Sequence, residues 1–316
     1  MVRMKRGIFI NSQKANCSIY ESGLMIYDIL KESTGYTLDY VETDKTLRNY
    51  YKVAKPPYNF HIINWHPHTL AIPQQLIVKF PARIAIVVEV GPVEYTPITP
   101  DFFDAFAIID PTKKKVPGKY YPLPRPVLRL PTKPLLTKDK LVLGSFGLYS
   151  RQFSNEKRFG EIIENANTSG RECIVRINLP RPDYTSTSLP IIIEYGKWLK
   201  SLAKSNVEVR VTHDYMSREQ LVEWLSEHHM NCFPYYRERA GLSAVTDQSI
   251  SAGRAIMTTA CNTFRHLHKY IGHYPKESYI SLLSSTLDGV KQMQEDWSPE
   301  NFRKEFNEML ADKRIA

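Results

Sequence analysis

Residues 231–259 read NCFPYYRERAGLSAVTDQSISAGRAIMTT, and this stretch decides the expected fold. The apolar run Met230–Phe233 predicts a short buried strand, and a polar loop around Gly241 follows it. The small residues of Thr246–Ala252 predict a helix, and Ala255–Thr258 predicts the next strand. A strand, a loop, a helix and a second strand in this order form the repeating unit of α/β sheets.

The same alternation extends over most of the chain. Strands are expected at 6–11, 38–41, 60–65, 82–90, 105–109, 141–147, 173–177 and 207–211, and helices at 19–31, 159–165, 191–203, 217–228 and 298–312. Continuous apolar runs of this kind belong to strands that are covered on both faces. We therefore expect an α/β fold with two doubly wound, Rossmann-like domains facing a cleft, with ligands at the carboxyl ends of the strands.

A proline-rich, basic segment separates the two halves. Proline at this density does not fit inside helices or central strands. The expected division is an N-terminal domain at 1–116, a linker at 117–139, a C-terminal domain at 140–295 and a helix at 296–316 that crosses back to the first domain.

Composition and charge bound the function classes. The chain has 316 residues, of which 42% are hydrophobic, and this excludes disordered, collagen-like and coiled-coil proteins. Lys and Arg number 42 against 33 Asp and Glu, so the net charge is +9 and favours phosphate-bearing partners.

The cysteines and the hydropathy pattern point to the cytoplasm. Cys17, Cys173, Cys232 and Cys261 form no CxxC pair, so we expect reduced thiols rather than a zinc site or disulfides. No window is apolar enough for a transmembrane segment, and the N-terminus does not read as a signal peptide.

The loop before the predicted helix at 246–252 has the chemistry of an anion site. Backbone amides around Leu242 and Ser243, at the start of a helix, can bind a diphosphate. The alternative is an ordinary strand, loop and helix in which Ser243 or Thr246 caps the helix.

This stretch resembles the donor-binding segment of GT-B type glycosyltransferases of the family-four kind. That segment reads roughly Pro-Ser-x-x-Glu-Gly-Phe-Gly-Leu and, seven or so residues later, Glu-Ala-x-Ala-x-Gly-x-Pro-Val. Here Cys232–Pro234 matches the strand end and Gly241–Ser243 the glycine loop. Both glutamates of the family's pair are absent: Ala240 stands in place of the first, and Gln248 in place of the ribose-binding second. Glutamine can still bond a ribose hydroxyl, without a carboxylate's charge-assisted strength.

The resemblance extends upstream over most of the C-terminal half. Gly147, Arg151 and Lys157 match the family's glycine turn and the basic residues that neutralise the donor diphosphate, and His213 falls in the loop near the nucleotide base. Cations placed there would stabilise the charge that develops on the leaving nucleotide diphosphate. The alternatives are a solvated helix start for Arg151, Lys157 and Arg158, and a cap-region histidine at 213.

The N-terminal half would bind the acceptor. Only Gly23 follows the first strand, where family members place a glycine-rich loop. His66 and His68 have no evident third metal ligand, GT-B enzymes generally need no metal, and we interpret the pair as cleft-lining acceptor residues. Glu89 ends a strand and is the candidate catalytic base; its alternative is an ion pair with Arg83.

A basic run borders the expected cleft. Lys113 and Lys115 are candidate acceptor-binding residues for a nucleic acid, a lipid-linked phosphate or an acidic glycan, and a solvated surface is the alternative. Tyr120 and Tyr121 would add surfaces for stacking bases.

The resemblance implies a metal-independent glycosyltransferase that moves a sugar from a nucleotide-sugar, with UDP as the guessed nucleotide, to a hydroxyl acceptor, with no cofactor. Two alternatives stay open: a phage-type glycosyltransferase that modifies a hydroxylated DNA base, and a non-catalytic binding protein on a degenerate glycosyltransferase scaffold. The acceptor, the sugar, the stereochemistry and the oligomeric state are left open.

Overall fold

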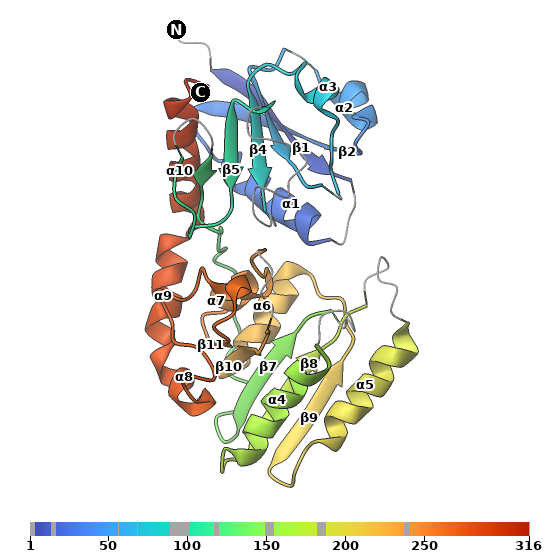
Figure 1. Cartoon of the computed structure of the whole chain (residues 1–316), viewed down its shortest axis with the longest axis vertical. Coiled ribbons are helices and arrows are strands. Elements are labelled where there is room, and N and C mark those ends of the chain that lie inside the picture. The colour runs from blue at the N-terminus through green and yellow to red at the C-terminus, as the bar shows by residue number, and fades with distance from the viewer. Residues whose placement is uncertain are drawn as a thin grey trace. The chain divides into compact units, whose positions relative to one another are not determined.

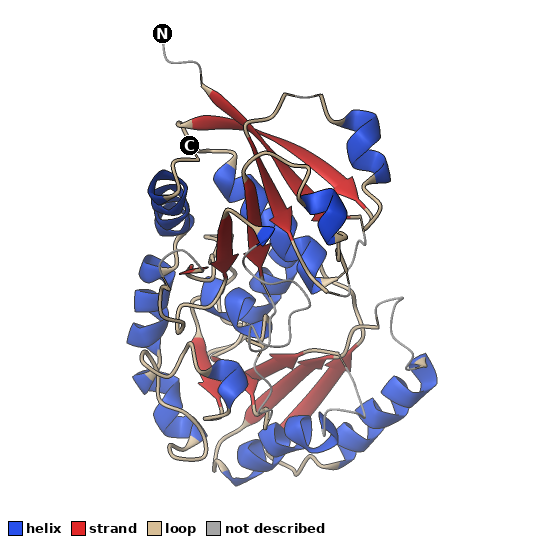
Figure 2. Cartoon of the chain, turned by 45° about the horizontal axis from the view of Figure 1, so that its top comes forward, coloured by secondary structure: helices blue, strands red, loops and turns tan. Residues whose placement is uncertain are grey.

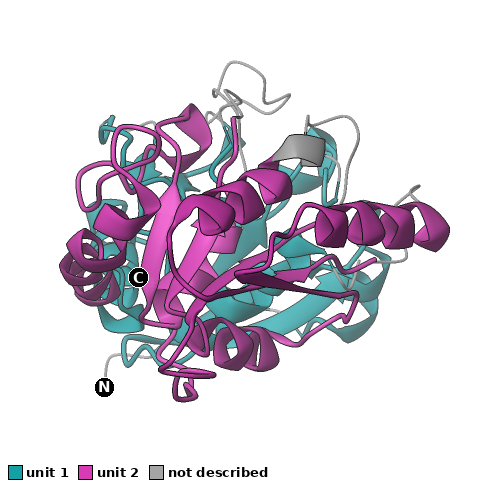
Figure 3. Ribbon diagram, turned by 90° about the horizontal axis from the view of Figure 1, so that it is seen from below, with its two compact units in different colours: residues 1–126, 240–242, 297–316 teal, residues 127–239, 243–296 magenta. Residues whose placement is uncertain are grey.

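The computed structural model describes residues 4–13, 17–55, 57–67, 69–88, 102–116, 120–148, 155–181, 188–236 and 241–315, with the backbone alone at 155–157. Its contacts divide the chain into unit 1, residues 1–126, 240–242 and 297–316, and unit 2, residues 127–239 and 243–296 (Figure 3). The chain first passes from unit 1 to unit 2 after Pro126, within the predicted linker, and it finally returns to unit 1 at Trp297, next to the predicted start of the terminal segment at 296. Each unit is described by itself below.

Unit 1 is built on a parallel sheet with the strand order β2-β1-β3-β4-β5-β6 (Figure 1). The strands are β1 (Lys5–Ser12), β2 (Tyr36–Thr43), β3 (Phe60–Asn64), β4 (Arg83–Val87), β5 (Ala105–Ile108) and β6 (Tyr121–Pro122). The helices are α1 (Ser18–Leu30), α2 (Arg48–Val53), α3 (Gln74–Ile77) and α10 (Pro299–Asp312). Because β1 pairs with both β2 and β3, the winding direction reverses between β1 and β3.

Both faces of this sheet are covered, as the apolar runs predict. Ile8 and Ile10 of β1 point into a core cluster that includes Tyr50 of α2. Phe9 points to the opposite face, where its ring centroid lies 6.0 Å from that of Tyr27 in α1. Figure 2 shows helices on the two sides of the strands.

The last helix completes unit 1. Phe306 of α10 is fully buried, and Arg303 donates a hydrogen bond to the Ile29 carbonyl of α1 at 3.1 Å. Lys5 Nζ, at the start of β1, donates to the Ile315 carbonyl at 2.7 Å. The two ends of the described chain therefore meet in the same unit.

Gly23 lets α1 approach the sheet closely. Asn64 Nδ2 donates to Asn11 Oδ1 and to the Ile19 carbonyl, both at 2.8 Å, and a Cβ at position 23 would lie 2.2 Å from Asn64 Nδ2 and 2.4 Å from Asn11 Oδ1. This glycine therefore makes room for a buried amide pair rather than for a phosphate.

Unit 2 is built on a second parallel sheet, ordered β11-β10-β7-β8-β9. The strands are β7 (Leu141–Phe146), β8 (Cys173–Asn178), β9 (Val207–Thr212), β10 (Met230–Phe233) and β11 (Ala255–Thr258). The helices are α4 (Asn155–Thr168), α5 (Leu189–Ser201), α6 (Arg218–Ser226), α7 (Val245–Ser251), α8 (Tyr279–Ser285) and α9 (Leu287–Asp296). A reciprocal capping box between Ser217 and Gln220 sets the start of α6.

The predicted alternation is confirmed in both units. Every predicted strand and helix forms within a few residues of its expected bounds, and residues 89–90 of the predicted strand at 82–90 lie outside the described residues. The helices α2, α3, α8 and α9 were not predicted. Among the described residues, no helix has the length and apolar character of a membrane span.

Candidate functional site

The carboxyl end of β7 carries a conformation that requires glycine. The strand ends at Phe146, and Gly147 follows with a φ of 149°, a backbone conformation that residues with a Cβ rarely adopt. The Gly147 amide donates to the Asn178 carbonyl of β8 at 3.1 Å. A Cβ at position 147 would lie 2.9 Å from Arg158 Nη2 and 3.2 Å from the Tyr235 hydroxyl.

Arg158 is a buried cation directly beside this glycine. It lies in the first turns of α4, and only 5% of its surface is exposed. Its guanidinium carbon lies 4.2 Å from the ring centroids of both Phe159 and Tyr235, and Nη2 donates to the Leu148 carbonyl at 3.4 Å. Its Nε is buried without a hydrogen-bond partner.

The electrostatics of this position favour an anion. Burial lowers the pKa of Arg158, and interactions with Tyr235 and Tyr195 partly offset that effect. Among the described residues, no carboxylate pairs with it. A buried charge that lacks a partner is costly, and an anion at the carboxyl end of β7 would supply both the opposite charge and an acceptor for Nε.

The sequence groups Arg158 with Arg151 and Lys157 at a basic helix start, but it assigns the diphosphate contacts to Arg151 and Lys157. Arg151 lies outside the described residues, and the structure does not describe the side chain of Lys157. Arg158 precedes Ile162 by four positions, and Ile162 is fully buried, so helical spacing places both on the inward face. That spacing is the signal that could have found it.

The predicted glycine loop differs from the expectation in one respect. The Ser243 amide donates to the Thr263 carbonyl at 3.2 Å, so its hydrogen is not available to an anion. Thr246 Oγ1 donates to the Ser243 carbonyl at 2.9 Å and lies 3.0 Å from His266 Nε2. The Ser243 amide and the Thr246 hydroxyl are thus both engaged in hydrogen bonds within unit 2, and the residue at the N-cap of α7 is Ala244 rather than Ser243 or Thr246.

The other residues predicted to bind the donor differ in how well their surroundings suit that role. A Cβ added at Gly241 would meet no atom within 4 Å, and the residue has no left-handed φ, so another residue could occupy this position without strain. Leu242 is buried. Gln248 lies on α7, and its Oε1 is buried without a hydrogen-bond partner, so an acceptor atom stands ready for a ribose hydroxyl. His213 follows β9, and its Nδ1 lies 3.3 Å from the Leu179 carbonyl.

The acceptor residues predicted in unit 1 are only partly described. Glu89 and His68 lie outside the described residues. His66 lies in a turn, with its Nδ1 3.1 Å from Thr69 Oγ1. Arg83, the alternative partner of Glu89, bonds Asp104 through its backbone amide at 2.7 Å and through Nε at 3.2 Å.

Part of the basic run makes contacts within unit 1. Lys115 forms an ion pair with Asp312 of α10 at 2.6 Å, and its Nζ lies 4.8 Å from the Tyr121 ring. Tyr121 is buried, so the expectation that its ring stacks on bases is wrong. Lys113 remains exposed.

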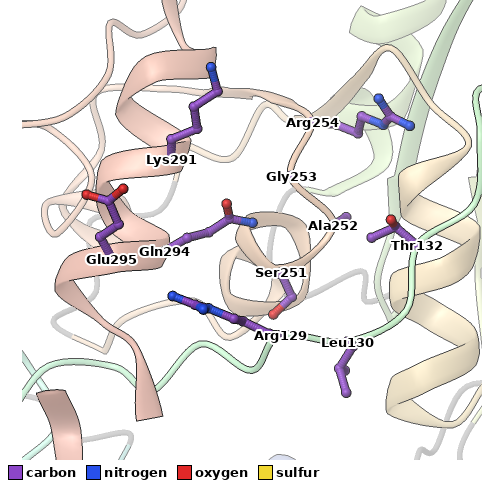
Figure 4. Close-up of a pocket in the computed structure, with 10 residues that line it drawn as sticks. All are labelled: Arg129, Leu130, Thr132, Ser251, Ala252, Gly253, Arg254, Lys291, Gln294 and Glu295. Carbon is purple, nitrogen blue, oxygen red and sulfur yellow. The ribbon is translucent and has the colours of Figure 1, made fainter. Parts of the chain in front are cut away.

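Two pockets lie outside the carboxyl end of β7. One, of about 440 Å³, is lined by residues at the carboxyl ends of β1 and β2 and after β3, including Ser12, Thr43 and Thr69. The other, of about 470 Å³, lies between α9, the turn after α7 and the segment 129–132 (Figure 4). Because Gly253 and Arg254 precede β11, this pocket is at the amino edge of the sheet, opposite to Gly147. Among the described residues, no three His, Cys, Asp or Glu side chains gather into a possible metal site.

Comparison with solved structures identifies the architecture. HepE from Anabaena in complex with UDP-glucose superposes with a TM-score of 0.61 over 97% of this chain and 99% of that one, at 8% identity. An α,α-trehalose-phosphate synthase (UDP-forming) from Burkholderia xenovorans gives 0.60 over 98% and 100%, at 10% identity. The chain has the GT-B fold.

The GT-B fold here is shared without detectable sequence kinship. The N-terminal domain of the Candida albicans trehalose-6-phosphate phosphatase gives a TM-score of 0.64 over 98% of this chain and 97% of that one, at 9% identity. No family model and no curated protein sequence matches this chain. The expected architecture, two Rossmann-like domains of the GT-B type, is confirmed.

Proposed function

We propose that this GT-B protein is a glycosyltransferase that moves a sugar from a nucleotide-sugar to a hydroxyl acceptor without a metal or a cofactor. The observation that carries the proposal is Arg158, a buried cation with an unpartnered Nε beside the glycine turn after β7. A nucleotide diphosphate is the anion that a GT-B fold would present there. UDP is the preferred nucleotide because the HepE structure contains UDP-glucose and the Burkholderia synthase is named as UDP-forming.

The reaction breaks the bond between the anomeric carbon and the diphosphate oxygen, and a new bond forms to the acceptor oxygen. The nucleotide diphosphate leaves with the electron pair, and Arg158 offsets the negative charge that grows on it. Arg151 and Lys157 would help Arg158 to offset this negative charge. Gln248 would accept a hydrogen bond from a ribose hydroxyl. Glu89 is proposed to take the proton of the acceptor hydroxyl.

The acceptor stays open among glycans, lipid-linked molecules and nucleic acids. Lys113 remains a candidate contact for an anionic acceptor, whereas the pairing of Lys115 with Asp312 argues for a structural role of Lys115. The proposed location is the cytoplasm, where nucleotide-sugars and reduced thiols such as the four free cysteines belong.

The test compares nucleotide binding in three proteins. UDP at a hundred times its dissociation constant should stabilise the native protein by about 2.7 kcal/mol, seen as a rise in the unfolding temperature. Arg158→Met should fold, because an unbranched apolar side chain replaces a buried charge. It should lose the UDP-dependent rise in unfolding temperature. Arg210→Met, on the exposed edge strand β9, is the matched control and should keep it.

The outcomes separate the alternatives. Turnover of a UDP-sugar in the presence of EDTA would support metal-independent transfer. A shift without turnover, even with water as acceptor, would favour the non-catalytic scaffold. The absence of a shift with any nucleoside diphosphate or nucleotide-sugar would overturn the proposal.

A further inference from the structure

One segment of unit 1 contains basic residues and no acidic ones, and the neighbouring Asp44 interacts with one of its cations, Arg48. Residues 45–88 contain six Lys or Arg and no Asp or Glu, whereas the whole chain has 42 basic and 33 acidic residues. Of the six, Arg83 is bonded to Asp104. The remaining cations fall on or beside α2 and α3.

These two helices form one surface. Tyr50 of α2 packs edge-on against Phe80, just after α3, with ring centroids 5.1 Å apart, and both belong to the same core cluster. Figure 1 shows α2 and α3 next to each other over the sheet. The outward side chains are the α2–α3 patch, made of Arg48, Tyr51, Lys52, Val53, Lys55, Val78 and Lys79.

The patch exposes apolar side chains that the core does not use. Tyr51 is 58% exposed, Val53 57% and Val78 50%, which places them among the most exposed large apolar residues of the described chain. Scattered apolar residues on a surface need no explanation, but here three of them lie on two adjacent helices.

The lysines of the patch form no ion pairs within the described residues, whereas Arg48 interacts with Asp44 just before α2. Lys52, Lys55 and Lys79 are exposed, and within the described ranges none of them forms an ion pair. Arg48 and Lys52 stand four positions apart on α2, a spacing at which like charges repel and weaken a helix. An external anionic surface would relieve this repulsion.

Exposed valines among lysines suit a lipid surface better than a nucleic acid. Lysine stems can lie along the headgroup layer with their ammonium groups at the phosphates, while aliphatic and aromatic tips enter the acyl boundary. The phosphate backbone of a nucleic acid offers the valines no such environment. We propose that the α2–α3 patch docks unit 1 reversibly on an anionic lipid bilayer.

The experiment is co-sedimentation of the full chain with two kinds of vesicle. One is pure phosphatidylcholine, and the other contains about a third phosphatidylserine. We expect binding to the anionic vesicles that weakens with salt, and little binding to the neutral ones. Lys52→Gln with Lys55→Gln should lower the partition coefficient about 25-fold, because each basic residue near the surface contributes about fivefold.

Two further variants make the test specific. Lys138→Gln with Lys276→Gln removes the same charge from exposed positions of unit 2 and should leave the partition unchanged. Val53→Ser with Val78→Ser keeps the charge and should still weaken vesicle binding several-fold. An equal loss in the Lys138/Lys276 variant, or no loss in the two-valine variant, would overturn the proposal. So would binding to single- or double-stranded DNA that depends on Lys52 and Lys55 in place of vesicle binding.

Discussion

Gly23→Ala tests whether close packing, rather than ligand binding, explains the glycine after β1. In an open helix this change would stabilise the native state by about 1 kcal/mol, because alanine has the higher helix propensity. Here the new methyl group would lie 2.2 Å from Asn64 Nδ2 and 2.4 Å from Asn11 Oδ1. Both asparagines are fully buried, so neither amide has a free direction in which to move.

The expected loss follows from the hydrogen bonds of this pair. Asn64 Nδ2 donates two bonds of 2.8 Å, and Asn11 Oδ1 also accepts the Ser12 amide at 2.9 Å. Leaving buried polar groups without partners costs about 1 to 3 kcal/mol each. For the two asparagines this is about 2 to 6 kcal/mol, and after subtracting the gain in helix propensity we expect a net destabilisation of about 1 to 5 kcal/mol.

Thermal unfolding of the full chain checks this, because a domain of about 150 residues loses about 2 to 4 °C per kcal/mol. The matched control is Gly35→Ala, where a Cβ meets no atom within 4 Å and φ is not left-handed, so its unfolding temperature should stay close to that of the parent chain. If Gly23→Ala unfolds at the same temperature as Gly35→Ala, the packing argument is wrong.

Two other perturbations probe unit 2. Gly147→Ala places a methyl group 2.9 Å from Arg158 Nη2 and should weaken UDP binding, as measured by calorimetry. The control Gly170→Ala has a φ of 68° and no atom within 4 Å of the new Cβ, so it should lower stability without changing UDP affinity. Equal UDP affinities in the two variants would contradict a role for the turn at Gly147. Burial lowers the pKa of His228 to about 3, so between pH 6.5 and 3 the imidazole is protonated in the unfolded chain but not in the folded one. The free energy of unfolding should therefore fall as the pH drops through this window, by up to about 1.4 kcal/mol per pH unit. His228→Gln should show a shallower pH dependence in denaturant titrations, and an unchanged slope would exclude this histidine as the cause.

The inner strands were predictable because most of them are apolar runs buried on both faces, whereas the edge strands β2 and β9 alternate apolar with polar residues. The helices that were missed are of two kinds. The helices α2 and α3 have six and four residues, too few for helical periodicity to emerge. The helix α9 is largely polar, and its two buried residues, Val290 and Met293, give little pattern to read.

Part of the candidate site could be read from the sequence. The sequence predicts a donor site at the carboxyl ends of the unit 2 strands, and Gly147 lies at one of these ends. It places Arg158 in a basic helix start with Arg151 and Lys157, and only the spacing of Arg158 from Ile162 indicates that its side chain is buried. The bond from the Ser243 amide to the Thr263 carbonyl joins residues far apart in the chain, and no local pattern reveals such a pair.

The return of α10 to unit 1 has a consequence for biosynthesis. Residues 297–316 leave the ribosome after the whole of unit 2, yet they carry Phe302 and Phe306, which are fully buried in the finished protein, and Asn307, which bonds Ser33 and Tyr36. During translation unit 2 can therefore fold while the first 126 residues still lack a helix that covers part of their surface. Unit 1 therefore completes its fold only after the last residues of the chain have been synthesised, and until then the surface that α10 covers stays exposed.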